Sequence, residues 1–425
     1  MNVVAASDTA ALAGLLETGW NPPQQVVAEV SQIVENVRSN GDGAILRYAR
    51  RFDDESFELS KLRVPIPILD SARSMVSREI GVALELAKER IGRFHARQRQ
   101  PDISYVEEDG TRYALARRPL RSVAIYAPRT AAAVSVLMGA VPAKIAGVPR
   151  IIVLSPAAID GSAAAVLFAC ALCAVDELYA VGGAQAVSAA AFGTYSIAPV
   201  DKIVGRGGVW TTEAKRQVFG RCGIDALAGP TEVLIVADDG ANSEYVVGEL
   251  LSQAELPGVV RLAVLSESRP LLEAVAQLVD TLDLRTLDRE EFVTEAISKR
   301  CRLIEASSRE ELFGLVNRLA PAYLCLQVRD ASAYLDRIYT AGTVFVGDMT
   351  PAVSGEYLAG TSHVVPTGGT ARFASSLSLT DFTRGFSVVE NTLERISNDA
   401  PMLEALADFD GLPHHAQSAR MRCGN

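Results

Sequence analysis

The sequence predicts an α/β protein with two doubly wound, Rossmann-like domains and small helical units at its N-terminal and C-terminal ends. Short apolar runs, bounded by Gly, Pro or Asp, alternate with segments whose apolar residues recur at helical spacing. Runs such as residues 233–237 are apolar throughout, which is typical of strands buried on both faces of a parallel sheet. The alternation covers residues 121–229 and starts again at residue 233, so we expect two sheets.

The elements are expected in the following order. Residues 1–20 indicate an N-terminal helical arm, which Asn21-Pro22-Pro23 separates from helices over 26–37, 44–52 and 71–98. The first series has strands over 123–127, 151–154, 177–181 and 202–204, with helices over 134–146, 163–174 and 184–192. The second series has strands over 233–237, 260–265, 302–306, 323–328 and 343–346, with helices over 243–254, 271–279, 310–319 and 331–338. A helix over 387–406 and a polar tail follow.

Composition excludes several classes of protein. The net charge of −10 and the lack of any basic block argue against nucleic acid or an anionic membrane as a partner. No leader pattern and no uninterrupted apolar run of spanning length is found. Six scattered cysteines indicate a reducing compartment, so we expect a cytoplasmic protein. Cys170 and Cys173 are predicted to be core residues, and His95 a solvated helix residue.

Two motifs in the second series carry a family resemblance. Ala-Gly-Pro-Thr-Glu-Val-Leu at residues 228–234 and Gln-Ala-Glu at 253–255 resemble the central segment of histidinol dehydrogenases, and other matches extend over almost the whole chain. The resemblance implies a first Rossmann-like domain from residues 21–120 and 230–378, with residues 121–229 inserted as the second and 379–425 as a C-terminal helical domain. It also implies a homodimer whose C-terminal unit completes the partner's site.

The resemblance implies an NAD pocket, with changes. Tyr126, Gln185 and Gly208 match the cofactor-binding positions. The family usually has Pro-Gly-Gly after the strand tyrosine and Gly-Pro-Gly-Asn in the later loop. This chain has Pro128-Arg129-Thr130 and Gly205-Arg206-Gly207-Gly208 instead. Side chains at Arg129 and Thr130 would fill space that the dinucleotide needs, so NAD binding is expected to be possible but weakened.

The zinc site that the resemblance implies is incomplete. The family's ligands are Gln, His, Asp and a second His, and the matching positions are Gln253, Leu256, Glu356 and His415. Leucine has no lone pair, so one imidazole ligand is lost. Glu255, His363 or His414 are the side chains that could compensate. The sequence leaves open whether Gln253, Glu356 and His415 still bind a metal.

The catalytic pair of the family is also replaced. Histidinol dehydrogenases carry Pro-Glu-His-Leu-Glu, whose Glu-His pair activates water and moves protons during two hydride transfers. Here the segment is Pro-Ala-Tyr-Leu-Cys at residues 321–325. Tyr323 is a poor base, since its ordinary pKa is near 10, but it can donate a hydrogen bond. His363 is the remaining candidate for acid–base work.

Other substrate-binding positions match: Thr231, Gln253, Tyr357, Asp410 and His415. These features favour a histidinol dehydrogenase-like oxidoreductase with an altered site, which acts on another alcohol or aldehyde or by a changed mechanism. Two alternatives stay open: a paralogue that catalyses a different reaction on a specialised metabolite, and a non-catalytic binding protein. Ordinary oxidation of histidinol to histidine is not expected, because the proton-carrying residues are missing.

Overall fold

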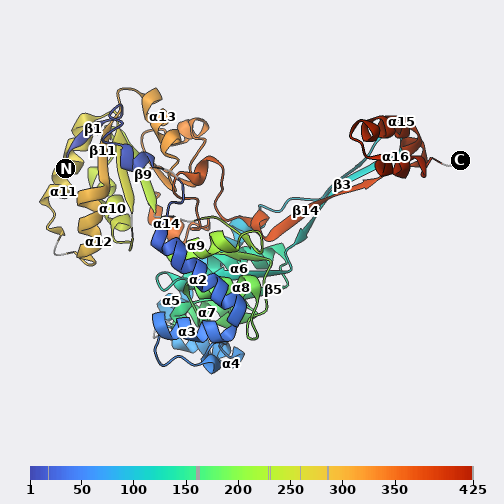
Figure 1. The fold of residues 1–425 in the computed structure, drawn as a ribbon. Helices are drawn as coiled ribbons and strands as arrows, with labels where there is room; N and C mark the ends of the chain where they lie inside the picture. Colours follow the sequence, from blue (N-terminus) through green and yellow to red (C-terminus); the bar gives the residue numbers. More distant parts are fainter. Residues whose placement is uncertain are drawn as a thin grey trace.

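The computed structural model describes residues 1–423 except 18, 159–162, 228, 230, 259 and 285–286. Two α/β domains pack against each other, and a long strand ribbon carries the C-terminal helices away from them (Figure 1). No helix in the described part of the chain is long and apolar enough to cross a membrane.

The domain that the resemblance gives as the inserted one comes first in the chain and is called the first domain below. It is built on a parallel sheet in the order β6-β5-β4-β7-β8. The strands are β4 (Ser122–Tyr126), β5 (Arg150–Leu154), β6 (Glu177–Tyr179), β7 (Lys202–Val204) and β8 (Gly223–Ile224). The helices that follow them are α6 (Ala132–Ala146), α7 (Ala163–Leu172), α8 (Gly183–Phe192) and α9 (Val209–Val218). The strand order reverses between β4 and β7, so a ligand crevice is expected beyond the carboxyl ends of these two strands.

The N-terminal helices pack on this sheet, which corrects the expectation that residues 21–120 complete the other domain. They are α2 (Gln24–Asn40), α3 (Asp42–Phe52), α4 (Ile66–Ser71) and α5 (Arg78–Ala96). α2 packs on α8 and α9, and α5 packs on α6. The reason is apolar burial: the buried valines of α2 join the core on one face of the sheet, and Leu84 and Ile91 of α5 join the core on the other face.

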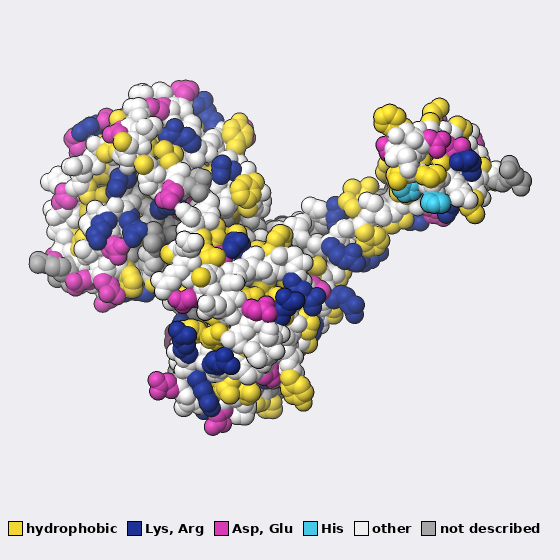
Figure 2. Space-filling model, in the orientation of Figure 1, with side chains coloured by type: hydrophobic (Ala, Val, Ile, Leu, Met, Phe, Trp, Pro, Cys, Tyr) yellow, Lys and Arg dark blue, Asp and Glu magenta, His cyan; other side chains and the backbone are white. Residues whose placement is uncertain are grey.

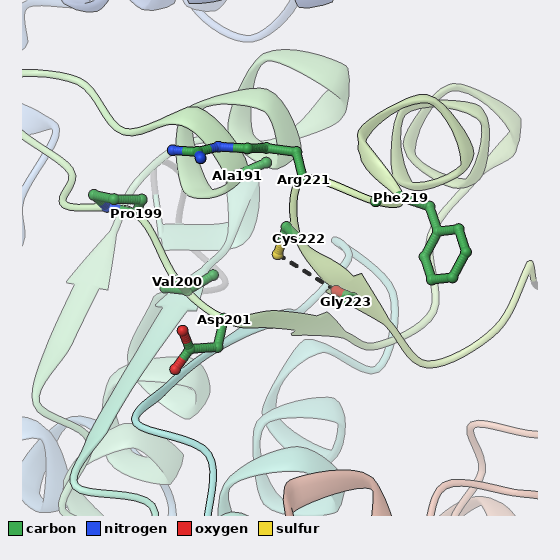
Figure 3. Close-up of a pocket in the computed structure, with 9 residues that line it drawn as sticks. Ala191, Pro199, Val200, Asp201, Phe219, Arg221, Cys222 and Gly223 are labelled. Carbon is green, nitrogen blue, oxygen red and sulfur yellow. Dashed lines mark hydrogen bonds between the residues drawn. The ribbon is translucent and has the colours of Figure 1, made fainter. Parts of the chain in front are cut away.

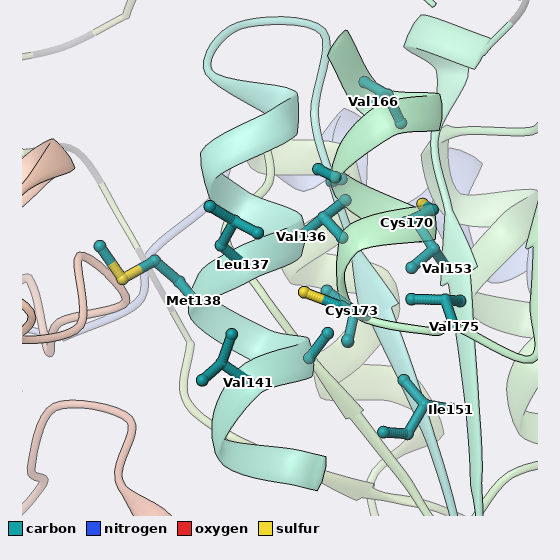
Figure 4. Packing of buried hydrophobic residues seen from close by; sticks show 14 of the residues in the cluster. Val136, Leu137, Met138, Val141, Ile151, Val153, Val166, Cys170, Cys173 and Val175 are labelled. Carbon is teal, nitrogen blue, oxygen red and sulfur yellow. The ribbon is translucent and has the colours of Figure 1, made fainter. Parts of the chain in front are cut away.

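Figure 4 shows the second of these cores, between α6, α7 and β5. Cys170 and Cys173 lie in it as free, buried thiols, and burial raises the pKa of Cys173 to about 12. The prediction that this pair belongs to the core is confirmed. The prediction for His95 is wrong: its side chain is fully buried, with Nδ1 2.9 Å from Gln98 Oε1. The arginines near His95 in the sequence suggested an exposed position, but His95 lies on the buried side of α5.

The second domain has a parallel sheet in the order β1-β11-β10-β9-β12-β13. Its strands are β1 (Val3–Ala5), β9 (Glu232–Ala237), β10 (Arg261–Ser266), β11 (Cys301–Glu305), β12 (Tyr323–Gln327) and β13 (Thr343–Val346). Its helices are α1 (Ala13–Leu16), α10 (Ser243–Ala254), α11 (Arg269–Thr281), α12 (Glu290–Glu295), α13 (Arg309–Leu319) and α14 (Ala352–Tyr357), with a 3₁₀ helix at Ala331–Arg337. The N-terminal segment is therefore an edge strand and one short helix, rather than a helical arm, because β1 pairs in parallel with β11.

A long strand ribbon that carries the C-terminal helices, called the arm below, was not expected from the sequence. β2 (Ile103–Val106), β3 (Arg112–Pro119) and β14 (Thr383–Glu390) form an antiparallel ribbon, which ends in α15 (Leu393–Phe409) and α16 (Pro413–Arg420). Residues 387–390 are consequently strand, not helix, because all of β14 pairs with β3, 264 or more residues earlier in the chain. Figure 1 shows α15 and α16 at the far end of this ribbon.

Candidate functional site

The loop after β7 lies directly on the end of β4. Gly205 has a φ of +115°, which favours glycine, and a Cβ there would collide with the carbonyl oxygen of Tyr126. The Gly205 N–H donates to Asp225 Oδ2 at 2.7 Å, and its carbonyl accepts from Lys215 Nζ at 3.0 Å. Lys215 and Asp225 form a buried ion pair. The backbone at Gly205 is thus held on both sides.

The predicted cofactor residues lie at the carboxyl ends of the strands around this loop. Tyr126 ends β4, and its buried Oη accepts from the Gly183 N–H at 3.0 Å. Gln185 follows β6, is buried, and donates from Nε2 to Asp53 Oδ2 at 3.5 Å. Gly208 is the exposed N-cap of α9, with open space where a side chain would stand. This edge combines a helix N-terminus with backbone that a ligand can approach closely.

Arg129 changes the same edge. Its Nη2 lies 3.1 Å from Asp53 Oδ1, and its Nη1 donates to the Pro156 carbonyl at 3.5 Å. Burial raises the pKa of Asp53 more than Arg129 lowers it, so the net shift is upward. The side chain of Arg129 therefore stands beside the partner of Gln185.

Arg206 connects the two domains. Its Nη1 and Nη2 donate to Glu356 Oε1 and Oε2 at 3.2 and 3.0 Å, a bidentate pair. The Arg206 side chain is 23% exposed and that of Glu356, on α14, is 10% exposed. The pair places a fixed positive charge on the carboxylate that the sequence assigned to a metal.

Three further side chains complete a network around Glu356. Tyr323, at the start of β12, donates from Oη to Glu356 Oε1 at 2.7 Å. His363 Nδ1 lies 3.5 Å from Glu356 Oε2, and its Nε2 lies 3.2 Å from Ser135 Oγ of α6. Ser135 and Arg206 come from the first domain, whereas Tyr323 and Glu356 come from the second. The network therefore exists only where the domains meet.

The charge states in this network follow from burial and from Arg206. Burial raises the pKa of Glu356, but Arg206 and the other donors outweigh it, so the net pKa is lowered and the group is a carboxylate. Burial, with Glu356 beside it, raises the pKa of Tyr323 well above 10. Burial, with Arg206 nearby, lowers the pKa of His363 to about 3. At neutral pH Tyr323 and His363 are both neutral hydrogen-bonding groups.

The other matched positions of the second domain are Gln253, Leu256, Thr231 and Tyr357. Gln253 lies on α10, which packs against α14; it is buried, and its Oε1 has no hydrogen-bond partner among the described residues. Leu256 packs on the apolar core of the domain. Thr231 precedes β9 and is half-buried, and Tyr357 is 45% exposed.

These residues do not fit a zinc ion. Leu256 offers no lone pair. Both oxygens of Glu356 already accept hydrogen bonds from the Arg206 guanidinium, which would stand beside a bound metal ion as a like charge. In the described ranges no three His, Cys, Asp or Glu side chains gather closely enough to hold a metal ion. Oε1 accepts two hydrogen bonds, so a metal at the remaining lone pair of Oε2 would lie directly beside the guanidinium.

Asp410 and His415 are not brought to the network within one chain. Both are exposed on the C-terminal unit, at the end of the ribbon. Figure 2 shows histidine side chains on the face of that unit and apolar side chains along the arm. Their role in a site requires a second chain.

A separate hollow of about 370 Å³ lies near β7 and β8. Figure 3 shows Asp201, Arg221 and Cys222 at its wall. Asp201 precedes β7, so the hollow lies by the amino end of that strand, whereas Arg206 follows its carboxyl end. None of the predicted site residues lines it.

Two residues of the network were not predicted from the sequence as members of the site: Ser135 and Arg206. A signal for Arg206 was present: a long cationic side chain interrupts a glycine cluster that follows a buried strand. Ser135 gave no signal, since it sits within an apolar helix and meets His363 across 228 residues.

Comparisons with known proteins agree with one another. The family model for histidinol dehydrogenase matches residues 19–423. Histidinol dehydrogenases of Listeria monocytogenes and Rhodospirillum rubrum are 38% and 39% identical over 408 and 419 residues, covering 96% and 97% of this chain and 95% and 96% of theirs. The crystal structure of histidinol dehydrogenase from Elizabethkingia anophelis superposes with a TM-score of 0.90 at 29% identity, covering 99% of this chain and 98% of that one. This chain belongs to the histidinol dehydrogenase family.

Proposed function

We propose that this protein is an NAD-linked oxidoreductase that interconverts a small alcohol, other than histidinol, with its aldehyde. One observation supports the proposal: Tyr126, Gln185 and Gly208 lie at the carboxyl edge of the first sheet, where the resemblance implies NAD, and Ala322 with a neutral Tyr323 stands where it implies the proton-carrying pair. NAD would supply the hydride acceptor. The chain's own residues would bind and orient the substrate in the cleft between the domains.

The replaced pair limits the reaction. Oxidising an aldehyde further requires an activated water, and a positioned general base is worth about 10²–10⁴-fold in rate. Tyr323 already donates a hydrogen bond to Glu356, and burial keeps its hydroxyl protonated. In the proposed reaction the alcohol would give its hydride to NAD and its hydroxyl proton to solvent water, and the reaction would stop there, with the aldehyde as product.

The site of one chain would be completed by its partner. The matched Asp410 and His415 lie at the end of α15 and in α16, and Figure 1 shows these helices far from α14, which carries Glu356. Exposed apolar side chains on the arm and on this unit, among them Leu406 and Phe409, suit an interface between copies. We propose a homodimer in which these C-terminal units are exchanged.

Calorimetry with NAD, followed by a screen of small alcohols with product analysis, tests this function. The expected result is saturable NAD binding and one NADH per alcohol, with aldehyde accumulating. Two NADH per alcohol, or growth of a histidine auxotroph that carries the gene, would overturn it.

A second function is favoured by Arg129, which stands at the dinucleotide edge beside Asp53. In that case the protein would catalyse a reaction without NAD. No NAD binding in the wild type, with binding restored in Arg129→Gly, is the result that would favour this second function.

A further inference from the structure

We infer that Arg206 takes the place of the metal ion in this site, and that its guanidinium is the fixed cation of a metal-independent centre. The inference rests on the cleft proposed above as the substrate site. It concerns what holds that cleft together and which cation faces the substrate, and its test does not require turnover.

The Glu356 carboxylate already accepts several hydrogen bonds. Glu356 stands where the family resemblance implies an acidic metal ligand. Its two oxygens accept from Arg206 Nη1 and Nη2, and Oε1 accepts from Tyr323 as well. While the bidentate pair is closed, a metal ion could use only the remaining lone pair of Oε2, and it would lie beside a permanent positive charge.

Two positions far apart in the sequence, Leu256 and Arg206, both differ from the pattern that the family resemblance implies. Leu256 removes an imidazole that a metal would need, and it packs in the apolar core of the second domain. Arg206 adds a cation from the first domain. One side chain removes a ligand and the other supplies the charge, so the two changes together are those of a site that exchanges a metal ion for a guanidinium.

The Arg206 guanidinium is held firmly and remains partly exposed. The backbone before it is fixed by the buried Lys215–Asp225 pair, through both polar atoms of Gly205. Arg206 is still 23% exposed. A guanidinium has five N–H donors, and Glu356 accepts from the two terminal nitrogens, which leaves donors for an oxygen of the substrate. The ligand class that fits is therefore an oxygen-bearing small molecule, such as an alkoxide, carbonyl or carboxylate.

Zinc calorimetry on the full-length protein, dialysed against chelator, tests the inference. The variants are Leu256→His, which restores the ligand, and Leu256→His combined with Arg206→Met, which also removes the guanidinium. The wild type is expected to bind no zinc with one-to-one stoichiometry. Removing Arg206 in the Leu256→His background is expected to tighten zinc binding by about 10- to 100-fold, the range over which a ligand's partners alter metal affinity.

Two outcomes would overturn the inference. One is stoichiometric zinc in the wild type, and the other is equal zinc affinity in Leu256→His with and without Arg206→Met. Should Arg206→Met not fold, Arg206→Pro provides the residue that the family usually has at this position and the same comparison is made with it. Because zinc affinity is measured rather than turnover, a failure here differs from a failure to find NAD binding or an alcohol substrate.

Discussion

Replacing Glu356 by Gln tests whether the interdomain ion pair stabilises the fold. The change removes the charge and leaves Arg206 unpaired. Removing one partner of a fully buried ion pair costs about 3–5 kcal/mol. Arg206 retains 23% exposure, and the Gln oxygen can still accept from Tyr323. We therefore expect a loss of about 2–3 kcal/mol, below the fully buried range.

Urea denaturation at pH 7, supported by thermal melting, is the assay. A loss of this size corresponds to a fall in Tm of roughly 4–12 °C for a unit of about 150–250 residues. Glu273→Gln is the matched control: its partner Arg269 is 51% exposed and Glu273 is 61% exposed. An exposed pair of this kind contributes little to stability, because solvent screens the two charges. Adding Arg206→Met to Glu356→Gln should restore part of the loss, because no unpaired guanidinium then remains.

The pH dependence gives a second check on the same residue. The pKa of Glu356 is lowered in the folded state, so its stabilising contribution is complete above the ordinary value of 4.5 and is lost as the pH falls through the folded-state pKa. The difference between wild type and Glu356→Gln should shrink below that pH. If Glu356→Gln is as stable as Glu273→Gln at pH 7, the ion pair does not hold the domains and the reasoning is refuted.

Three further predictions follow from the same contacts. Gly205→Ala should lower the free energy of unfolding by about 3 kcal/mol or more, because of backbone strain and the collision with Tyr126. The control Gly208→Ala should change the free energy of unfolding by under about 1 kcal/mol. Equal urea midpoints for the two variants would contradict this. The pKa of His363 is about 3 in the folded protein, and its ordinary value is 6.5. Between these pH values the unfolded chain binds more protons than the folded one. The free energy of unfolding should therefore fall as the pH drops from 6.5 to 3, by up to about 1.4 kcal/mol per pH unit. His363→Asn should flatten that slope in urea titrations, and an unchanged slope would show that another group causes it. Phe409→Glu, at a side chain 89% exposed, should shift the protein from dimer to monomer in sedimentation while changing monomer stability by under about 0.5 kcal/mol, and an intact dimer would place the interface elsewhere.

The regular α/β elements were predictable because their signal is local. Residues 233–237 and 323–328 are apolar throughout and became β9 and β12, and the first series became the sheet from β4 to β7 with α6, α7 and α8 between its strands. The two-residue strand β8 is too short to show periodicity, and α9 is mostly polar and charged, so neither was identified. β3 and β14 gave none that distinguishes a ribbon, since their pairing joins segments far apart in the chain.

The assignment of residues 21–120 failed for a related reason. The helical spacing of Val26, Val30, Ile33 and Val37 predicts an apolar face but not the surface that covers it. Either sheet could have accepted that face. Packing against α8 and α9 selected the first domain.

By itself the sequence determined the fold class and the family. It also predicts the loss of two residue types at the positions that the resemblance assigns to the chemistry, since an aliphatic Leu256 and an Ala322 cannot bind a metal or carry a proton in any conformation. Only the tertiary structure decided what replaced them. Arg206, Glu356, Tyr323, His363 and Ser135 are separated by as much as 228 residues along the chain, and the charge states of Glu356 and His363 depend on burial and on a guanidinium from another domain. Electrostatic interactions of this kind depend on distance and on exclusion of water, and neither is defined until the two domains pack.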